Sequence, residues 1–210
     1  PIIQGKLSIK DGATIRGIVF DGASEVVDAI RIDDTVTGAP VVISGCTVRN
    51  YTNRFVYVSL SGKIESLTID DCIFIGADNS TTNKAIYASS AHTQVETLSV
   101  TNSTFLNFNT GSNYFFRINC GEELVLMPVV LIDHCTFYNC YDRRGVYLYN
   151  AGRSTIKNCI SAFSERRDDT KSFTAYGDES IVKNVISYNV DLYGSAPKEN
   201  IISKNPLFVD

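Results

Sequence analysis

A repeated unit between Lys84 and Phe137 constrains the fold of this chain more than any other feature of its sequence. The first copy reads KAIYASS and then LSVTNSTFLN, and the second reads YFFRINC and then VLIDHCTFYN. The first half of each copy alternates apolar and polar residues, which is the pattern of a strand with one buried face. The second half reads as another short strand, a polar corner, and a small residue followed two places later by Phe. Each copy therefore predicts a pair of short strands joined by turns.

The same unit recurs along the chain at a nearly fixed interval. The centres of the first strand are separated by 26, 30, 30, 30 and 27 residues and fall at Arg31, Tyr57, Tyr87, Arg117, Tyr147 and Thr174. The residues on both sides of each centre are apolar, so we expect them to face inward. The corner residue of the second strand always follows an aliphatic residue by three places; these corners are Ile18, Cys46, Cys72, Ser103, Cys135, Cys159 and Val185.

Strands and turns that repeat at this period without helix are typical of a solenoid, in which each winding buries its apolar face against its neighbours. Leucine-rich repeats have shorter units, and propeller blades contain four strands per unit. An immunoglobulin-like sandwich has many short strands, but it does not stack identical positions at fixed offsets. We therefore predict an all-β fold, a right-handed single-stranded parallel β-helix of about seven coils, whose hand follows from the general rule for parallel crossovers.

Length and charge set further limits. Residues 1–210 are expected to form a single domain, because a solenoid grows along one axis and needs no second core. The sequence starts and stops close to strand-like runs, which indicates a segment of a longer chain with other domains. No apolar run approaches the ~18–20 residues of a membrane span. The net charge of −4 argues against nucleic acid as a partner, because phosphate binding normally requires a basic excess.

Four of the six cysteines occupy the corner column, namely Cys46, Cys72, Cys135 and Cys159. A buried cysteine in such a column acts as a small hydrophobic residue. Stacked positions lie ~4.8 Å apart, whereas a disulfide requires Cβ atoms ~3.8 Å apart. We therefore expect free thiols at these four positions. Cys120 and Cys140 lie off the column, and their state stays open.

A second column follows the corner by four residues and contains mainly asparagine, at Asn50, Gly76, Asn107, Asn139 and Asn189. Asparagine and glycine tolerate left-handed backbone angles, and stacked asparagine amides can bond along the axis. This column is therefore expected to shape a turn. His92 and His134 are too far apart in the repeat to pair, and each is expected to be a turn residue.

Several motifs resemble those of a known superfamily. IRGIVFDG, the recurring unit in TIDDCIF, LIDHCTF and TIKNCIS, and the terminal NPLFVD resemble the pectin-lyase-like β-helix superfamily. They are more closely similar to uncharacterised β-helix domains in surface lipoproteins of polysaccharide-degrading gut bacteria. The resemblance covers essentially the whole chain and rests on structural motifs. It implies a secreted or outer-cell-surface bacterial protein associated with complex carbohydrate.

The catalytic motifs of that superfamily are not matched. Polygalacturonases have paired aspartates followed by a His-Gly and an Arg-x-Lys, a set that does not occur here. The segment Leu131 to Cys135 resembles part of a pectate lyase, but it is also one more copy of the repeat. Asp70 and Asp133 share a column in which Thr101 separates them. No metal site and no cofactor are therefore predicted.

The outward positions of the first strand form the candidate site. Tyrosine rings stack on sugar rings, and arginine and lysine pair with carboxylates or sulfates. The substrate-binding candidates on this exposed face are Tyr57, Tyr87, Arg117, Arg144, Tyr147 and Tyr149. The expected partner is an acidic polysaccharide that lies along the helix. The alternative is that these residues are ordinary strand formers that keep the sheet soluble.

Two functions remain open at this point, a carbohydrate-binding module and a polysaccharide lyase. Cleavage of a uronic-acid polymer by β-elimination needs a cation at the carboxylate and a base for the C5 proton. A lysine beside another cation loses its proton more easily. The resemblance to β-helix lyases implies Lys84 as the base and Arg117 as the neutralising cation or leaving-group partner.

Overall fold

The computed structural model describes residues 1–23, 27–33, 36, 38–59, 63–76, 83–90, 93–108, 114–120, 128–140, 144–149, 151–164 and 171–208. These residues form strands β1 to β22 and contain no helix. All of the paired strands run parallel to one another. The described part of the chain offers no helix of the length and apolarity that a membrane span requires.

The strands stack in three rows along one axis. The first row is a separate sheet of β2 (Leu7–Ile9), β5 (Ile30–Ile32), β8 (Arg54–Val58), β11 (Lys84–Ser90), β14 (Phe116–Cys120), β17 (Val146–Leu148), β19 (Lys171–Ala175) and β21 (Asp191–Tyr193). The second row is β3 (Ala13–Arg16), β6 (Val41–Ser44), β9 (Lys63–Asp70), β12 (Gln94–Thr101), β15 (Val129–Asp133), β18 (Arg153–Ala162), β20 (Ile181–Tyr188) and β22 (Lys198–Ile202). The third row is β1 (Ile2–Ile3), β4 (Val19–Asp21), β7 (Thr47–Arg49), β10 (Ile73–Ile75), β13 (Thr104–Leu106) and β16 (Thr136–Tyr138).

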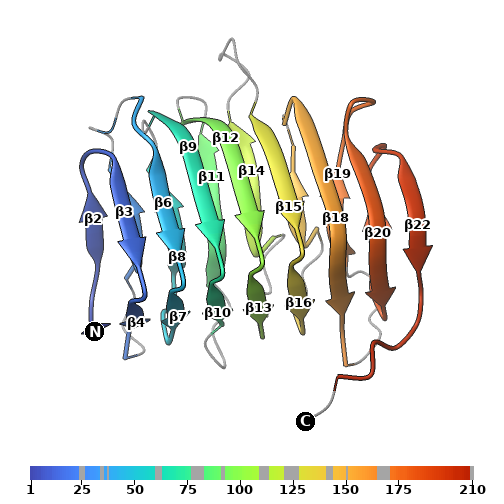
Figure 1. The fold of residues 1–210 in the computed structure, drawn as a ribbon, viewed down its shortest axis with the longest axis horizontal. Coiled ribbons are helices and arrows are strands. Elements are labelled where there is room, and N and C mark those ends of the chain that lie inside the picture. The colour runs from blue at the N-terminus through green and yellow to red at the C-terminus, as the bar shows by residue number, and fades with distance from the viewer. Residues whose placement is uncertain are drawn as a thin grey trace.

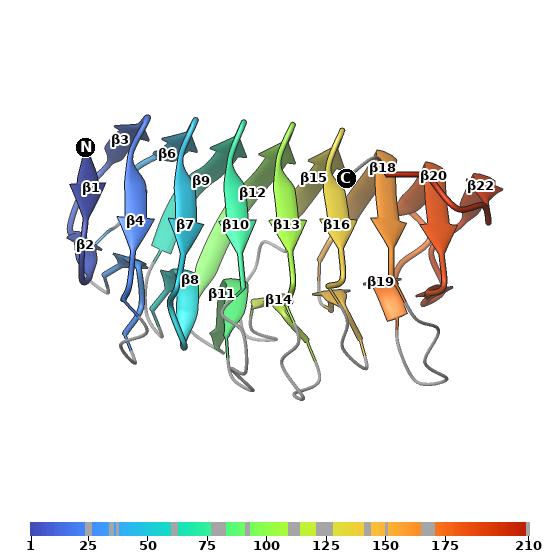
Figure 2. The ribbon, with the colours of Figure 1, turned by 90° about the horizontal axis from the view of Figure 1, so that it is seen from below.

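The two ribbon views show how the rows enclose the interior. In Figure 1 the chain advances from left to right, β2 runs upward, and the row of β3 runs downward on the near side. Figure 2, seen from below, shows the row of β4 facing the viewer and the row of β2 opposite that of β3. The winding is therefore right-handed, and the predicted parallel β-solenoid is confirmed.

The number of windings differs slightly from the prediction. The windings from β2–β4 to β14–β16 each contain one strand of every row, which gives about five turns of three separate strands. The second and third rows then merge, because β18 pairs with β15 through its first half and with β16 through its second half. The later strands, β17 to β22, therefore form windings of two strands each, which the predicted seven coils did not distinguish.

The predicted inward columns form the interior. The residues that flank the centre of each first-row strand are fully or almost fully buried from Ile30 to Ala175. The aliphatic column of the second row is buried from Ile15 to Val182, and the corner column is buried from Cys46 to Val185. Phe74, Phe105 and Phe137 add an aromatic stack, with ring centroids 4.9 Å apart and planes within 7° of parallel. Successive windings thus cover one another with mostly apolar side chains at equivalent positions.

The five cysteines whose side chains are described are free and buried, including all four of the corner column. Each corner thiol donates a hydrogen bond to a backbone carbonyl; the Cys159 thiol, for example, lies 3.0 Å from the Lys157 oxygen. Cys140 is also a free thiol, and burial raises its pKa to about 12. The side chain of Cys120 lies outside the described part of the structure. The expectation of free corner thiols is therefore confirmed.

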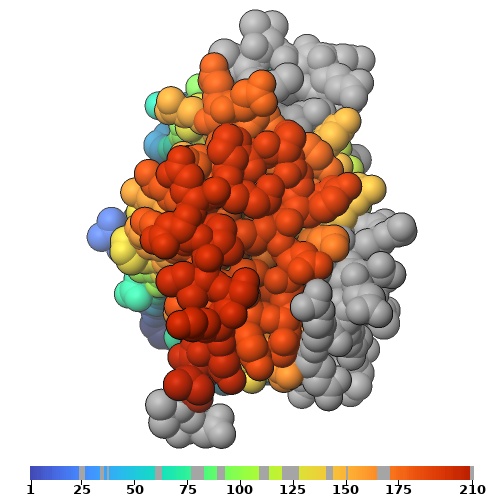
Figure 3. Space-filling view, turned by 90° about the vertical axis from the view of Figure 1, so that its right-hand side faces the viewer, coloured from blue at the N-terminus to red at the C-terminus, as the bar shows by residue number. Residues whose placement is uncertain are grey.

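The parallel sheets continue into the last windings. There β21 and β22 pair in parallel with β19 and β20, although residues 192–200 show no alternation of apolar and polar residues. Figure 3 looks along the solenoid axis onto this end, where residues of the last windings, orange to red, form most of the described surface in view. Beyond β22 the chain turns back beneath the third row, and Phe208 packs edge-on against Tyr138 with ring centroids 5.2 Å apart. The sheet pairing extends further than the alternation of apolar residues.

Candidate binding strip

The outward side chains of the first row form one continuous surface, which we call the strip. Its central column is in register from strand to strand, because Arg31 pairs with Tyr57, Tyr57 with Tyr87, Tyr87 with Arg117, and Arg117 with Tyr147. The register continues through Thr174 to Tyr193. The cations and tyrosines of the strip are Arg31, Arg54, Tyr57, Lys84, Tyr87, Tyr114, Arg117, Arg144, Tyr147, Tyr149, Lys171, Tyr176 and Tyr193. All of the candidates from the sequence lie on it.

In the N-terminal part of the strip, around Arg54 and Tyr57, the side chains cover one another and leave little ring surface exposed. The Arg54 guanidinium lies 3.5 Å from the centre of the Tyr57 ring, and Tyr57 is only 5% exposed. Arg54 also donates two hydrogen bonds, of 2.7 and 3.1 Å, to the buried carboxylate of Asp28. Its charge is therefore already compensated. The expectation that Tyr57 is exposed is wrong, because a neighbouring cation covers its ring.

The central part of the strip gathers three cations around two tyrosines. The rings of Tyr114 and Tyr147 are stacked, with centroids 6.0 Å apart and planes 14° from parallel. Arg117 hydrogen-bonds the Tyr114 hydroxyl and lies 4.4 Å from the centre of that ring. The Lys84 amino group lies 5.6 Å from the same centre, and the Arg144 guanidinium lies 4.8 Å from the centre of Tyr147. Lys84 and Arg117, the pair considered from the sequence, thus both lie close to the Tyr114 ring.

The two arginines of this central part lack a carboxylate partner within the described part of the chain, because neither Arg117 nor Arg144 forms an ion pair there. The Arg117 Nε atom is buried and has no acceptor there. Burial raises the pKa of both Tyr114 and Tyr147 above the ordinary value, so these phenols stay protonated near neutral pH. Tyr147 is only 6% exposed, so the expectation that its ring is open to a ligand is also wrong.

The C-terminal part of the strip has open rings instead. Tyr149 stacks on Tyr147 with centroids 5.6 Å apart, and Tyr176 stands edge-on to both rings. Tyr149 is 40% exposed and Tyr193 is 55% exposed. Next to them lies a hollow of about 290 Å³, lined by Tyr176, Leu192, Tyr193, Gly194 and Ser195. The sequence reasoning missed Tyr193, because it lies in β21 (Asp191–Tyr193), a strand of only three residues.

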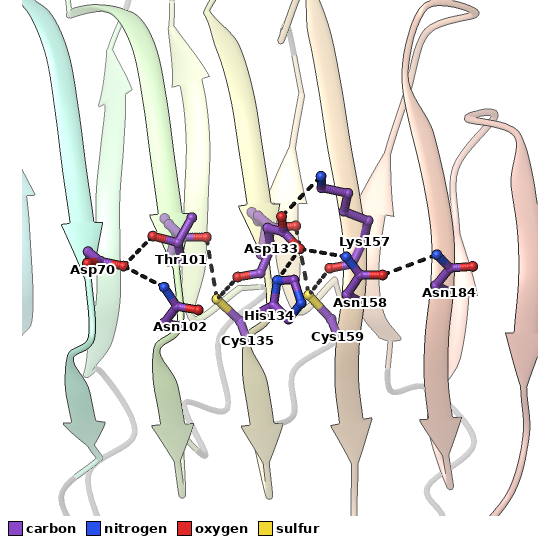
Figure 4. Close-up of polar contacts among 12 residues, drawn as sticks. Asp70, Thr101, Asn102, Asp133, His134, Cys135, Lys157, Asn158, Cys159 and Asn184 are labelled. Atoms are coloured by element: carbon purple, nitrogen blue, oxygen red, sulfur yellow. Dashed lines mark hydrogen bonds and ion pairs between the residues drawn. The ribbon is translucent and has the colours of Figure 1, made fainter.

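A second polar column runs along the corner between the second and third rows, on residues that come just before the corner residues, and Figure 4 shows most of it. In this corner ladder the Asn184 amide donates to Asn158, and Asn158 donates to Asp133, at 3.1 and 2.9 Å. Asp133 also contacts Lys157 at 3.1 Å and His134 at 2.7 Å. The ladder consists of Asp70, Thr101, Asn102, Asp133, His134, Lys157, Asn158, Asn184 and Asn200.

The backbone explains the corner ladder. Asn102, His134, Asn158 and Asn184 have φ between 51° and 53°, the left-handed region that asparagine tolerates. The expected turn role of His134 is thus confirmed, whereas His92 lies outside the described residues. In the other column, Asn50, Asn107, Asn139 and Asn189 also have positive φ, as predicted, whereas Gly76 does not. Within the described part of the chain, no three metal-ligating side chains gather at a site.

Comparison with known proteins identifies a family model that matches the chain. A family model described as "Domain of unknown function (DUF4957)" matches residues 2–110, just over half of the 210 residues. The match contains β1 to β13 and the strip as far as Tyr87, and it ends before Tyr114, Arg117 and Tyr147. No curated protein matches the chain.

Proposed function

Because the chain belongs to the DUF4957 family, whose description assigns no activity, we propose a function from the geometry of the strip. The protein is a carbohydrate-binding module that holds an acidic polysaccharide along the first row of the solenoid. It acts outside the cell, secreted or on the outer surface, as part of a longer chain with other domains. The resemblance to pectin-lyase-like proteins of polysaccharide-degrading bacteria supports this setting.

The observation that carries the proposal is that Arg117 and Arg144, beside the rings of Tyr114 and Tyr147, have no carboxylate partner among the described residues. Their guanidinium groups lie 4.4 Å and 4.8 Å from the centres of those two rings, in a chain whose net charge is −4. A bound anion would offset these two positive charges. Arginine also matches the two oxygens of a carboxylate or sulfate. The central part of the strip therefore favours an acidic ligand.

The shape of the surface supports a polymer rather than a small molecule. The strip runs over successive strands spaced ~4.8 Å apart, and its cations recur from Arg31 to Lys171 along the axis. A long ligand can therefore contact several windings at once. Hydrogen bonds to charged groups contribute about 1.5–3 kcal/mol each, so the loss of one cation is expected to weaken binding by about tenfold or more.

The test measures equilibrium binding of polygalacturonate, alginate and chondroitin sulfate, with dextran as the uncharged comparison. The parent protein is expected to bind at least one acidic polymer, with affinity that falls as salt rises. Arg117→Ala and Arg144→Ala should each weaken that binding. Arg153→Ala, an exposed arginine at the start of β18 on another row, is the matched control and should bind like the parent. Failure of every acidic polymer to bind would exclude this function.

A polysaccharide lyase is the second candidate, and the convergence of Lys84 and Arg117 on Tyr114 favours it. In that reaction Arg117 would neutralise the uronate carboxylate and Lys84 would take the C5 proton. The C4–O bond would then break, a C4–C5 double bond would form, and the leaving oxygen would need a proton. Tyr114 lies beside both cations and keeps its phenol proton at neutral pH, so it could supply that proton.

The lyase is tested with the same polymers by the ultraviolet absorbance of the unsaturated product. If the reaction occurs, Lys84→Ala should abolish it, whereas Lys63→Ala, an exposed lysine on β9, should cleave like the parent. Lack of absorbance with all three acidic polymers would exclude the lyase and leave the binding module standing. Cleavage by Lys84→Ala at the parent rate would exclude the assigned base.

A further inference from the structure

The hollow at the C-terminal part of the strip has the dimensions of a site for one small ring. Its volume of about 290 Å³ lies just below the ~300–1,000 Å³ of typical small-molecule sites. Tyr176 lines one side, and Leu192 to Ser195 line the rest. A whole polymer cannot enter such a space, but a single sugar residue can.

The walls of the hollow are held by backbone contacts. Gly194 has φ of 96°, and a Cβ atom at this position would lie 1.9 Å from the carbonyl oxygen of Ala175. The chain therefore approaches β19 more closely than any other residue type would allow. The Ser195 hydroxyl accepts a hydrogen bond of 3.2 Å from the Gly177 amide, which leaves its own proton for a ligand oxygen. The hollow is thus formed before any ligand binds.

The rings around the hollow are accessible, unlike those of the central strip. Tyr193 and Tyr149 are 55% and 40% exposed, whereas Tyr57 and Tyr147 are 5% and 6% exposed. The apolar face of a sugar ring can pack on an open aromatic ring. Stacking on the strip is therefore concentrated near the hollow, while the buried rings hold the cations in place.

The two lysines beside the hollow already have oxygen partners. The Lys171 amino group lies 3.4 Å from the carboxylate of Asp191. The Lys198 amino group donates hydrogen bonds of 2.9 and 3.2 Å to the carbonyl oxygens of Gly194 and Ala196. Both amino groups are therefore engaged, whereas Arg117 and Arg144 have no carboxylate partner among the described residues. This difference favours an uncharged occupant.

We propose that the hollow is a subsite for one uncharged sugar ring, and that Arg117 and Arg144 hold acidic groups of the same polymer. This inference rests on the proposed binding function and narrows its ligand to a polysaccharide that contains both neutral and acidic sugars. The occupant packs on Tyr193 or Tyr149 and accepts a hydrogen bond from Ser195. The two parts of the strip thereby recognise different sugars.

The experiment compares two acidic ligands of equal length by calorimetry. Hyaluronan oligosaccharides alternate a uronic acid with an uncharged amino sugar, and polygalacturonate oligosaccharides contain uronic acids alone. The parent protein should bind the alternating ligand more tightly, by about three- to tenfold for one stacked ring. Tyr193→Ala should remove this preference and bind polygalacturonate like the parent, whereas Tyr193→Phe, which keeps the ring, should retain the preference. Because Tyr193 is exposed, thermal melting of both variants should match the parent.

The possible outcomes separate this inference from the function on which it rests. If the parent shows no preference, or if Tyr193→Ala keeps it, the hollow is not a sugar subsite. The binding function still stands in that case, provided that Arg117→Ala weakens both ligands. If the parent binds neither ligand and none of the acidic polymers, both proposals are wrong.

Discussion

Two polar columns run along this solenoid, the strip on the first row and the corner ladder between the second and third rows, and they differ in how fully their groups are paired. In the corner ladder, the amides of Asn158 and Asn184 each donate to the preceding winding, and Asp133 has three partners. In the strip, Arg117 and Arg144 have no carboxylate partner among the described residues. A repeat can therefore build a structural column and a ligand-binding column with equally polar residues.

This contrast provides a criterion for reading a solenoid surface. A column whose hydrogen bonds close on themselves stabilises the turn and leaves little for a ligand to satisfy. A column with charges that repel one another is tolerated at some cost in stability, which is typical of a functional surface. Substitutions in the corner ladder should consequently reduce stability, and substitutions in the strip should reduce binding.

The largest effect is expected beneath the corner ladder, at Ile132. This residue is fully buried in β15, two positions before His134 of the ladder and three before the corner residue Cys135. Ile132→Asp would bury an unpaired charge between two windings and should destabilise the fold by more than about 4 kcal/mol. Urea unfolding measures the change, with Ile132→Val as the control at about 0.5–1.5 kcal/mol. An Ile132→Asp variant as stable as the parent would contradict the register of the second row.

The next effect concerns the corner ladder itself. Asn158→Ala removes two side-chain hydrogen bonds. It also leaves an alanine at φ of 52°, where asparagine is tolerated because its side chain bonds locally. We expect a loss of about 2–3 kcal/mol in the free energy of unfolding. Asn158→Gly keeps the left-handed turn and should lose less. Equal stability of both variants and the parent would show that the ladder does not stabilise the turn.

A smaller effect should appear in the pH dependence of stability. Burial acts to raise the pKa of Asp133, but hydrogen bonds from Asn158 and Lys157 and the charge of His134 lower it below the ordinary 3.8. A depressed folded-state pKa gives stability that is present above 3.8 and is lost as the pH falls towards the folded value. Asp133→Asn should therefore be less stable than the parent at pH 6, and the difference should shrink below pH 3.8. A difference that is constant with pH would contradict this account.

The smallest effect on stability is expected in the strip. Replacing Tyr87 and Arg117 together by Ala removes a half-buried ring and a cation but no interior side chain. The free energy of unfolding should fall by about 1 kcal/mol or less, while binding of acidic polysaccharide should be lost. Parallel melting and binding measurements test both parts. A double variant that binds as well as the parent would remove these residues from the site.

The sequence alone predicted the fold because a solenoid repeats its core at fixed offsets. The six centres from Arg31 to Thr174 and the corner column lie in register as their spacing predicted. The corner ladder was missed, although a residue that tolerates positive φ precedes each corner, such as Asn102, His134 and Asn158. The position before the corner is occupied by different residue types, so its shared positive φ is harder to recognise from the sequence than a column of apolar residues.

The sequence predicted which residues belong to the strip, but it did not predict which of their rings are exposed. Its members follow from the period, whereas the burial of Tyr57 and Tyr147 depends on the side-chain conformations of Arg54, Arg117 and Arg144. Periodicity carries no information about those conformations. Tyr193 was missed because β21 has only three residues, too few to show alternation.

The crowding of tyrosines on the strip also has a spectroscopic consequence. The chain contains no tryptophan, and seven of its eleven tyrosines, at positions 57, 87, 114, 147, 149, 176 and 193, lie on this one surface. Neighbouring rings from Tyr147 to Tyr176 are 5.6–6.5 Å apart, close enough to exchange excitation energy. Ultraviolet emission from the unlabelled protein should therefore come largely from the strip, and a ligand that alters one ring should change the emission of its neighbours.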